Sequence, residues 1–367
     1  MSSPTPGTVA DRIIDGDLHA ADGASLLSWL RGDVQVWDLM NAADRVRRAR
    51  FADKVHLCSI VNAKEGGCPE DCGFCSQSRH FETHVAPNKF TATDTIVAHS
   101  ERAGQRGASA LGLVTATRGL EQGTKGLQHV VDGVAAVRAA GHTEAHASVG
   151  FLDDGAMDEL IDAGLTELNH NLESGRSFFE TIVSTHTYDE RIDTIRRAKS
   201  KGLRTCVGGI FGMGEKPEDR VELAEQLREL DVDEVPLNFL VGIDGTKLAK
   251  VEPLAPMEML RIIAAYRLFL PRQNIFIAAG RDHLGQLLPL MFSAGASGMM
   301  VGDFLTTPNR GVEDDLAMLR DLGLSAMTCG ESRPEMQEDR DAGSTAPPAA
   351  FPPPTKRPGG AKLPILA

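Results

Sequence analysis

Three cysteines stand close together in the segment CPEDCGFC, at Cys68, Cys72 and Cys75. The chain has six cysteines in 367 residues, so half of its thiols lie in this stretch. Three thiols cannot all pair as disulfides within the segment, and thiolates at this spacing can converge on one metal centre. A structural zinc site needs a fourth ligand, and neither His56 nor His80 stands at a suitable spacing. A three-thiolate iron–sulfur cluster would instead leave one iron open, which is typical of a reactive centre.

The composition indicates a globular protein with an acidic surface. Hydrophobic residues make up 42% of the chain and charged residues 24%, and 38 basic against 51 acidic residues give a net charge of −13. This balance argues against a nucleic-acid partner. No stretch of the sequence has the apolar run of a membrane span. The N-terminal residues MSSPTPGTVADRI do not resemble a secretory signal. We therefore expect a cytoplasmic protein with reduced thiols, in which clustered cysteines bind metal or take part in catalysis.

The segment that follows residue 53 predicts alternating strands and helices, which would position the cysteines. Between residues 54 and 324, short apolar or β-branched runs alternate with amphipathic stretches such as LQHVVDGVAAVRAAG and YDERIDTIRRAKSKG. Eight runs predict strands: VHLCSIV from Val55, ALGLVTA from Ala110, EAHASVG from Glu144, ELNHNL from Glu167, RTCVGGI from Arg204, EVPLNFL from Glu234, IFIAAG from Ile275 and SGMMVG from Ser297. This alternation favours a (β/α)8 TIM-type barrel, with the active site at the strand C-terminal ends. A doubly wound open sheet is the alternative.

The pattern also predicts the division of the chain. Residues 1–53 form an N-terminal helical extension, with a loose beginning and helices near 24–31 and 36–51. Residues 54–324 form the barrel. Residues 325–367 are rich in proline and alanine and hold few large apolar residues, so they predict a disordered tail, which includes Cys329.

The cysteine motif follows the first predicted strand, carries Phe74 before its last cysteine, and resembles that of radical S-adenosylmethionine enzymes. Further segments strengthen the resemblance in order: NAKEGGCPEDCGFCSQS, ELNHNLESGRSFF, THTYDERIDTI, CVGGIFGMGE, VPLNFL, AAGRDHLG and GDFLTTPNRGVEDD. Together they are similar to the biotin synthase family over about residues 54–324. The resemblance implies a [4Fe–4S] cluster on Cys68, Cys72 and Cys75, with S-adenosylmethionine bound to the open iron. It also implies the radical-based insertion of sulfur between two unactivated carbons of dethiobiotin, without a side-chain acid or base.

Cofactor and substrate residues follow from the same resemblance. Asn171 and Glu173 contact the cofactor ribose, and Arg191 pairs with the cofactor carboxylate. Asn171 and Asn238 contact the ureido ring of the substrate. From the residues alone, polar caps of a sheet end and a solvated helix arginine remain alternatives.

The alternation of side chains along a strand also gives an expectation for NHNLE. It places Asn169, Asn171 and Glu173 on one face, with His170 and Leu172 on the other.

The resemblance further implies a second cluster deeper in the barrel, a [2Fe–2S] centre held by three cysteines and one arginine, whose sulfide is thought to enter the product. Cys206 and Arg281 match two of these positions, while Gly112 and His146 replace two cysteines. Glycine has no ligating side chain, but imidazole can ligate iron, so His146 is a third candidate ligand. A hydrogen-bonded core histidine is the alternative. We therefore expect a second iron–sulfur cluster, [2Fe–2S] or a variant, and the role of Cys58 stays open.

Two other functions remain open at this point. The missing cysteines are compatible with a related radical enzyme for carbon-skeleton or methyl transfer that has lost sulfur donation. A zinc-binding protein without catalysis is the other alternative. The family resemblance also implies a homodimer and an electron donor such as flavodoxin or ferredoxin.

Overall fold

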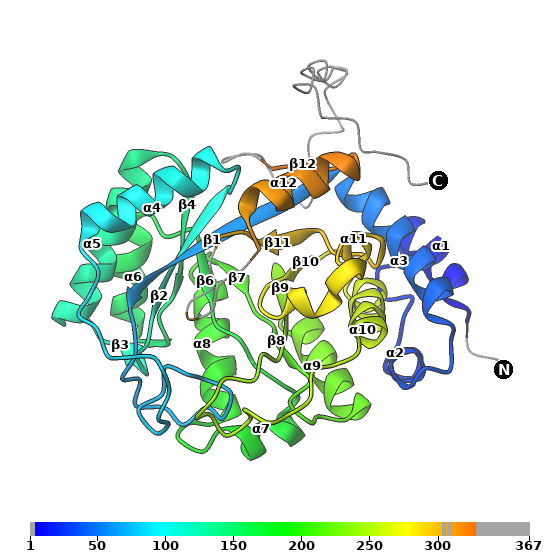
Figure 1. Cartoon of the computed structure of the whole chain (residues 1–367), viewed down its shortest axis with the longest axis horizontal. Helices are drawn as coiled ribbons and strands as arrows, with labels where there is room; N and C mark the ends of the chain where they lie inside the picture. The colour runs from blue at the N-terminus through cyan, green and yellow to red at the C-terminus, as the bar shows by residue number, and fades with distance from the viewer. Residues whose placement is uncertain (1–3, 303–305, 307–309, 328–367) are drawn as a thin grey trace, which may run out of the picture. The chain divides into compact units, whose positions relative to one another are not determined.

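The centre of the structure is a closed barrel of parallel strands (Figure 1). The structure is a computed structural model that describes residues 4–302, 306 and 310–327. The barrel strands, in spatial order, are β1 (Lys54–Lys64), β2 (Ala110–Thr115), β4 (Glu144–Ser148), β6 (Glu167–Asn169), β7 (Arg204–Cys206), β9 (Glu234–Phe239), β10 (Asn274–Ile277) and β11 (Gly298–Met300). β11 pairs with β1 and closes the barrel. The predicted (β/α)8 barrel is therefore confirmed, and the open sheet is excluded.

The helices form a ring outside the strands (Figure 1). The long ones are α4 (Thr93–Gln105), α5 (Lys125–Ala140), α6 (Asp154–Ala163), α8 (Tyr188–Ser200), α9 (Pro217–Glu229), α10 (Pro256–Phe269) and α12 (Val312–Asp321). Shorter elements are α7 (Arg176–Ile182), η1 (Arg281–Leu287), α11 (Leu290–Ser293), β3 (Gly119–Leu120), β5 (Phe151–Leu152) and β8 (Gly209–Phe211), which pairs with β9. In α5, Thr124 caps the first turn and Gly141 ends the helix in the left-handed conformation. Val130 and Val134 of this helix are fully buried in the core between helices and strands.

Three helices precede the barrel: α1 (Pro6–Ile14), α2 (Gly23–Arg31) and α3 (Val36–Phe51). The loose beginning that we expected is wrong for α1. The Thr5 side chain accepts a hydrogen bond from the Thr8 N–H at 3.3 Å, and Pro6 stands in the first turn, where its missing N–H is harmless. Val9 and Ile13 are buried on the side of α1 that packs against α3 and α10. Capping and the burial of one face therefore order this segment as a helix.

The C-terminal end of the described chain returns to the first strand. β12 (Ser325–Ala326) pairs in parallel with Lys54 and Val55 of β1. The predicted tail, 325–367, thus begins inside an ordered pairing. Its remainder from residue 328, with Cys329, lies outside the described residues. Within the described part of the chain, no helix is long and apolar enough to cross a membrane.

Candidate active site

A cavity of about 340 Å³ lies at the C-terminal ends of the barrel strands, where TIM-type barrels place their chemistry. Its lining includes most of the site residues predicted from the sequence: Cys68, Cys72, Cys75, Asn171, Glu173, Arg191, Cys206 and Asn238. The three cysteines follow β1, Asn171 and Glu173 follow β6, and the others lie on α8 (Arg191), β7 (Cys206) and β9 (Asn238). The barrel thus brings segments far apart in sequence around one space.

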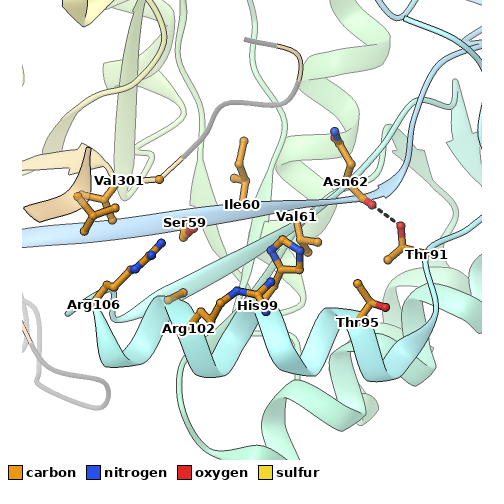
Figure 2. A pocket seen from close by; sticks show the side chains of 13 residues that line it. Ser59, Ile60, Val61, Asn62, Thr91, Thr95, His99, Arg102, Arg106 and Val301 are labelled. Atoms are coloured by element: carbon orange, nitrogen blue, oxygen red, sulfur yellow. Dashed lines mark hydrogen bonds between the residues drawn. The ribbon is translucent and has the colours of Figure 1, made fainter. Parts of the chain in front are cut away.

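A second cavity, of about 460 Å³, lies between β1 and α4 (Figure 2). His99 and Arg102 of α4, and Arg106 just after it, contribute to its lining. None of the described residues around it was predicted as a site residue, so we place the chemistry in the cavity inside the barrel.

Backbone hydrogen bonds give the cysteine loop its shape. The Cys68 N–H donates to the Gln77 carbonyl at 2.9 Å, and the Cys75 N–H donates to the Cys72 carbonyl at 2.9 Å. Gly66 has a φ of 65°, and an added Cβ would lie 2.9 Å from the Ala86 carbonyl oxygen, so the loop entry requires glycine.

The three thiols are free and partly exposed. Burial raises the pKa of Cys75 to about 11 and also raises the pKa of Cys68 and Cys72. Because a thiolate is the form that ligates metal, a cationic iron centre would favour the charged form that burial disfavours. Three convergent free thiols without a disulfide partner therefore fit a cluster.

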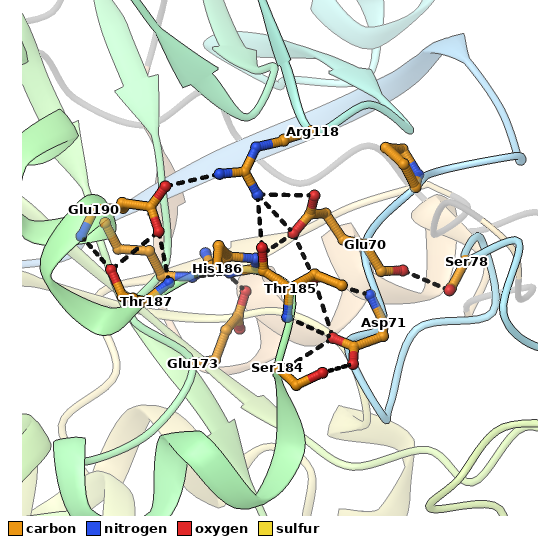
Figure 3. Close-up of polar contacts among 12 residues, drawn as sticks. Glu70, Asp71, Ser78, Arg118, Glu173, Ser184, Thr185, His186, Thr187 and Glu190 are labelled. Atoms are coloured by element: carbon orange, nitrogen blue, oxygen red, sulfur yellow. Dashed lines mark hydrogen bonds and ion pairs between the residues drawn. The ribbon is translucent and has the colours of Figure 1, made fainter.

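Two carboxylates between the cysteines tie the loop to the segment before α8 (Figure 3). Asp71 accepts hydrogen bonds from the backbone N–H groups of Ser184 at 2.9 Å and Thr185 at 3.2 Å. Glu70 accepts from the Thr185 hydroxyl at 2.6 Å and from Arg118 at 3.1 Å. Although burial opposes ionisation, these bonds lower the pKa of Asp71 to about 2 and lower the pKa of Glu70 as well. Both carboxylates are thus charged anchors of the loop.

The predicted cofactor residues line the same cavity. Arg191 donates from Nη1 to the Asn171 carbonyl at 2.6 Å, and its Nη1 lies 3.7 Å from Glu173 Oε1. Glu173 has a φ of 70°, which is uncommon outside glycine and concentrates at functional sites. Burial raises the pKa of Glu173, with the charge of Arg191 opposing the shift.

One detail of the predicted strand end is wrong. We expected His170 on the face opposite Asn171, yet His170 also lines the cavity. β6 ends at Asn169, so the alternation of side chains does not continue through NHNLE.

Both predicted substrate amides bind the backbone where β7 is followed by β8. Asn171 Oδ1 accepts from the Gly208 N–H at 3.0 Å, and Asn238 Nδ2 donates to the Gly209 carbonyl at 3.2 Å. An added Cβ on Gly208 would lie 1.9 Å from the Pro236 carbonyl oxygen. The close approach of this backbone to β9 therefore requires glycine at position 208. It holds the two amides at the cavity wall.

The deeper candidates are only partly brought together. Cys206 and Cys58 are buried and both line the cavity, as does Gly112. The Cys206 sulfur and one carboxylate oxygen each of Glu167 and Glu234 lie within 4.8 Å of one another. This group offers ligand types that can hold iron.

His146 is completely enclosed beside this group. Its Nδ1 lies 3.0 Å from Glu167 Oε1, and its Nε2 lies 3.5 Å from Glu144 Oε2. Burial opposes the charged ring, yet the charge of Glu167 raises the pKa of His146. His146 is not among the described residues that line the cavity.

Arg281, which was predicted for the second cluster, binds a carboxylate of the chain. Its Nη1 and Nη2 donate to the two carboxylate oxygens of Asp315 on α12, at 3.0 and 2.5 Å. Both side chains are fully buried, and Arg281 is not among the described residues lining the cavity. The anionic partner that a buried arginine requires is thus a carboxylate of the chain itself.

Sequence reasoning also missed residues of this site. Glu70, Arg118 and His186 line the cavity and interact with one another or with Arg191. Their signals were present but ambiguous: Glu70 stands between two cysteines, and His186 precedes Arg191 by five residues in THTYDERID.

Comparison with known proteins agrees with this geometry. Residues 66–227 match the Radical SAM superfamily, and residues 236–325 match the Biotin and Thiamin Synthesis associated domain. Biotin synthases of Geotalea daltonii and Trichlorobacter lovleyi are 42% and 45% identical to the chain, over 88% and 86% of it and 98% and 95% of their own lengths.

Solved structures share the fold at low sequence identity. Methylornithine synthase aligns with a TM-score of 0.74 at 19% identity, over 91% of this chain and 99% of its own. The [FeFe]-hydrogenase maturase HydG aligns with a TM-score of 0.75 at 12% identity, over 91% and 80%. On the strength of the close relatives and the two matched domains, the chain belongs to the biotin synthase family of radical S-adenosylmethionine enzymes.

Proposed function

We propose that the chain converts dethiobiotin into biotin by radical-based insertion of sulfur between two unactivated carbons. The observation that carries this function is one cavity in which three free cysteines meet Asn171, Arg191 and Asn238, in a chain of the biotin synthase family. A carbon-skeleton or methyl-transfer enzyme is not favoured, because the relatives that cover 88% of the chain are biotin synthases.

Cys68, Cys72 and Cys75 would hold a [4Fe–4S] cluster at the mouth of the cavity. With S-adenosylmethionine bound, such a cluster would supply the electron for reductive cleavage of the sulfonium to the 5′-deoxyadenosyl radical. The fit rests on the chain's own donors, which are three free thiols on a loop held by Glu70 and Asp71.

The remaining residues bind and orient the reactants. Arg191 offers its guanidinium to the cofactor carboxylate, and Glu173 accepts from the ribose hydroxyls. Asn171 and Asn238 present amide donors and acceptors to the ureido ring. Apolar side chains complete the wall and exclude water from the radical: Ile60, Val114, Phe276, Ala278 and Met300.

We further propose that a second iron–sulfur cluster is held deeper in the cavity, at Cys206. Its thiol, together with Glu167 and Glu234, fits an iron centre. Arg281 does not fit as a ligand in this arrangement, because both of its terminal nitrogens bind Asp315. The ligand set would therefore differ from three cysteines and one arginine.

Other partners are proposed from the family. They are dethiobiotin as substrate, flavodoxin or ferredoxin as electron donor, and a second copy of the chain, in the cytoplasm.

The test is biotin formation by anaerobically reconstituted protein with S-adenosylmethionine, dethiobiotin and a low-potential reductant. We expect biotin, rescue of a biotin auxotroph, and loss of both in Cys72→Ala. Cys206→Ala should still cleave S-adenosylmethionine but form no biotin. A product without new sulfur, and a single [4Fe–4S] cluster per chain, would favour the other radical enzyme. Tightly bound zinc without a brown chromophore would instead indicate a non-catalytic metal protein.

A further inference from the structure

The cysteine loop and the cofactor arginine are connected through a single side chain, His186. It lies in the segment before α8, and Figure 3 shows it beside Glu70 and Thr185. His186 Nδ1 contacts Glu70 Oε2, and Arg191 donates from Nε to His186 Nε2 at 3.0 Å. Glu70 stands between Cys68 and Cys72 in sequence. One imidazole thus joins the loop to the arginine.

The two contacts assign the ring its proton. A guanidinium N–H can only donate, so Nε2 of His186 must accept from Arg191. The carboxylate of Glu70 accepts, so Nδ1 carries the proton and donates to it. His186 is therefore a neutral imidazole with its proton on Nδ1. Burial, and next the charge of Arg191, lower the pKa of His186, in agreement with a neutral ring.

Aromatic side chains hold the imidazole in this orientation. The His186 ring meets Phe151 edge-on at 5.2 Å and Phe179 at 5.7 Å between ring centroids. His186 is 6% exposed, so it has little room to rotate. Phe179 also lies 5.6 Å from the guanidinium carbon of Arg191, as in a cation–π contact.

One terminal nitrogen of the Arg191 guanidinium, Nη2, is left to bind a ligand. Its Nε is taken by His186, and its Nη1 is taken by the Asn171 carbonyl and lies near Glu173. Its Nη2 has no hydrogen-bond partner among the described residues, while Arg191 lines the cavity. The orientation of Nη2 toward the cavity therefore depends on the groups that fix Nε and Nη1.

We propose that His186 is a positioning residue that couples the cysteine loop to the cofactor-binding arginine. Through Nδ1 it holds Glu70 and the loop between Cys68 and Cys72. Through Nε2 it fixes the guanidinium of Arg191 for the carboxylate of S-adenosylmethionine. This inference rests on the proposed function and specifies how its two binding sites are held together.

Two amide variants separate the two contacts. In His186→Asn, the side-chain N–H₂ stands near the position of Nδ1 and can still donate to Glu70, but nothing reaches Arg191. In His186→Gln, the longer side chain brings its carbonyl oxygen near the position of Nε2 and can still accept from Arg191, while the bond to Glu70 is lost.

Tyr188→Phe is the matched control. The Tyr188 ring also packs on Phe179, at 5.3 Å, but its hydroxyl has no hydrogen-bond partner among the described residues. Removing this hydroxyl alters the same aromatic group without touching either contact of His186.

Three quantities are measured on reconstituted full-length protein: iron retained per chain after gel filtration, the Kd for S-adenosylmethionine per loaded cluster, and the Tm of the apoprotein. We expect His186→Asn to retain iron like the wild type and to bind S-adenosylmethionine about tenfold more weakly, the effect of losing one hydrogen bond to a charged group. We expect His186→Gln to lose iron faster while its Kd per loaded cluster stays within about threefold of the wild type. Tyr188→Phe should change none of the three quantities.

The outcomes distinguish the inference from the function on which it rests. If wild-type protein holds no cluster or binds no S-adenosylmethionine, the proposed function fails. If the wild type does both and His186→Asn binds S-adenosylmethionine as tightly, the positioning role is wrong. Equal losses of iron, affinity and Tm in both amide variants would reduce His186 to a packing residue and would also overturn the inference.

Discussion

At the scale of single residues, Arg281 and Asp315 show what a buried charge requires. Their side chains are 0% exposed and joined by two hydrogen bonds in the fork geometry. Such a pair is costly to break, because removing one partner takes opposite charge away from the other, which stays buried.

We predict that Asp315→Ala lowers the free energy of unfolding by about 3–5 kcal/mol. The double variant Arg281→Met with Asp315→Leu should recover much of that loss, since neither charge then remains. Urea unfolding of the apoprotein measures both. Arg196→Ala, which removes an exposed pair with Glu229, serves as the control and should change stability little. A loss below about 1 kcal/mol for Asp315→Ala would contradict the prediction.

His170 predicts a dependence of stability on pH. Burial, reinforced by the charge of Arg191, lowers its pKa well below the ordinary value of 6.5. Since the unfolded chain takes up a proton near pH 6.5 and the folded chain does not, the contribution is fully present above that pH and is lost as the pH falls. We expect the difference in unfolding free energy between wild type and His170→Gln to shrink by about 1.4 kcal/mol for each pH unit below 6. Urea unfolding from pH 7.5 to 5 measures it, and a constant difference would refute a buried neutral histidine.

The sequence was informative about residues whose partners are close along the chain. The three cysteines could be assigned to one centre because they lie within eight residues. The partner of Arg281 could not be predicted, because Asp315 lies on a helix 34 residues away. The contact between Glu70 and His186 spans 116 residues, and only the closed barrel brings them together.

At the scale of elements, hydrophobic periodicity was sufficient to predict the barrel strands. All eight predicted runs correspond to barrel strands, because each alternates or stays apolar over several residues. RTCVGGI was predicted as one strand but is divided into β7 and β8, where Gly208 and Asn171 make their local contact. α1 was missed because its stabilising surface is supplied by α3 and α10, which the local pattern does not reveal.

The pairing of β12 with β1 predicts where the fold ends. The Ser325 N–H donates to the Asp53 carbonyl and the Met327 N–H to the Val55 carbonyl, both at 2.9 Å, and Met327 is buried. A chain ending at Leu324 should therefore be less stable than one ending at Met327, by about 1–3 kcal/mol. Thermal unfolding of the two truncated chains isolates this pairing. Equal Tm values would show that β12 contributes nothing to the barrel.

At the scale of the whole molecule, the homodimer stays a prediction with a measurable charge dependence. Each chain carries a net charge of −13, so a dimer carries twice that charge, and repulsion between the copies weakens as salt screens it. We expect sedimentation equilibrium to give twice the chain mass of 39.3 kDa, with the dimer fraction rising between 50 and about 300 mM salt. A mass of 39.3 kDa at every protein concentration would contradict the dimer.

The thiols differ in solvent exposure, so their rates of alkylation can report on iron binding. Cys68, Cys72 and Cys75 are partly exposed, whereas Cys58 and Cys206 are buried. An alkylating reagent should thus reach the first group sooner in the apoprotein, and iron bound to those sulfurs should shield them. After a timed alkylation, mass spectrometry of the peptides then reports, for each cysteine, what fraction of the protein has iron bound there.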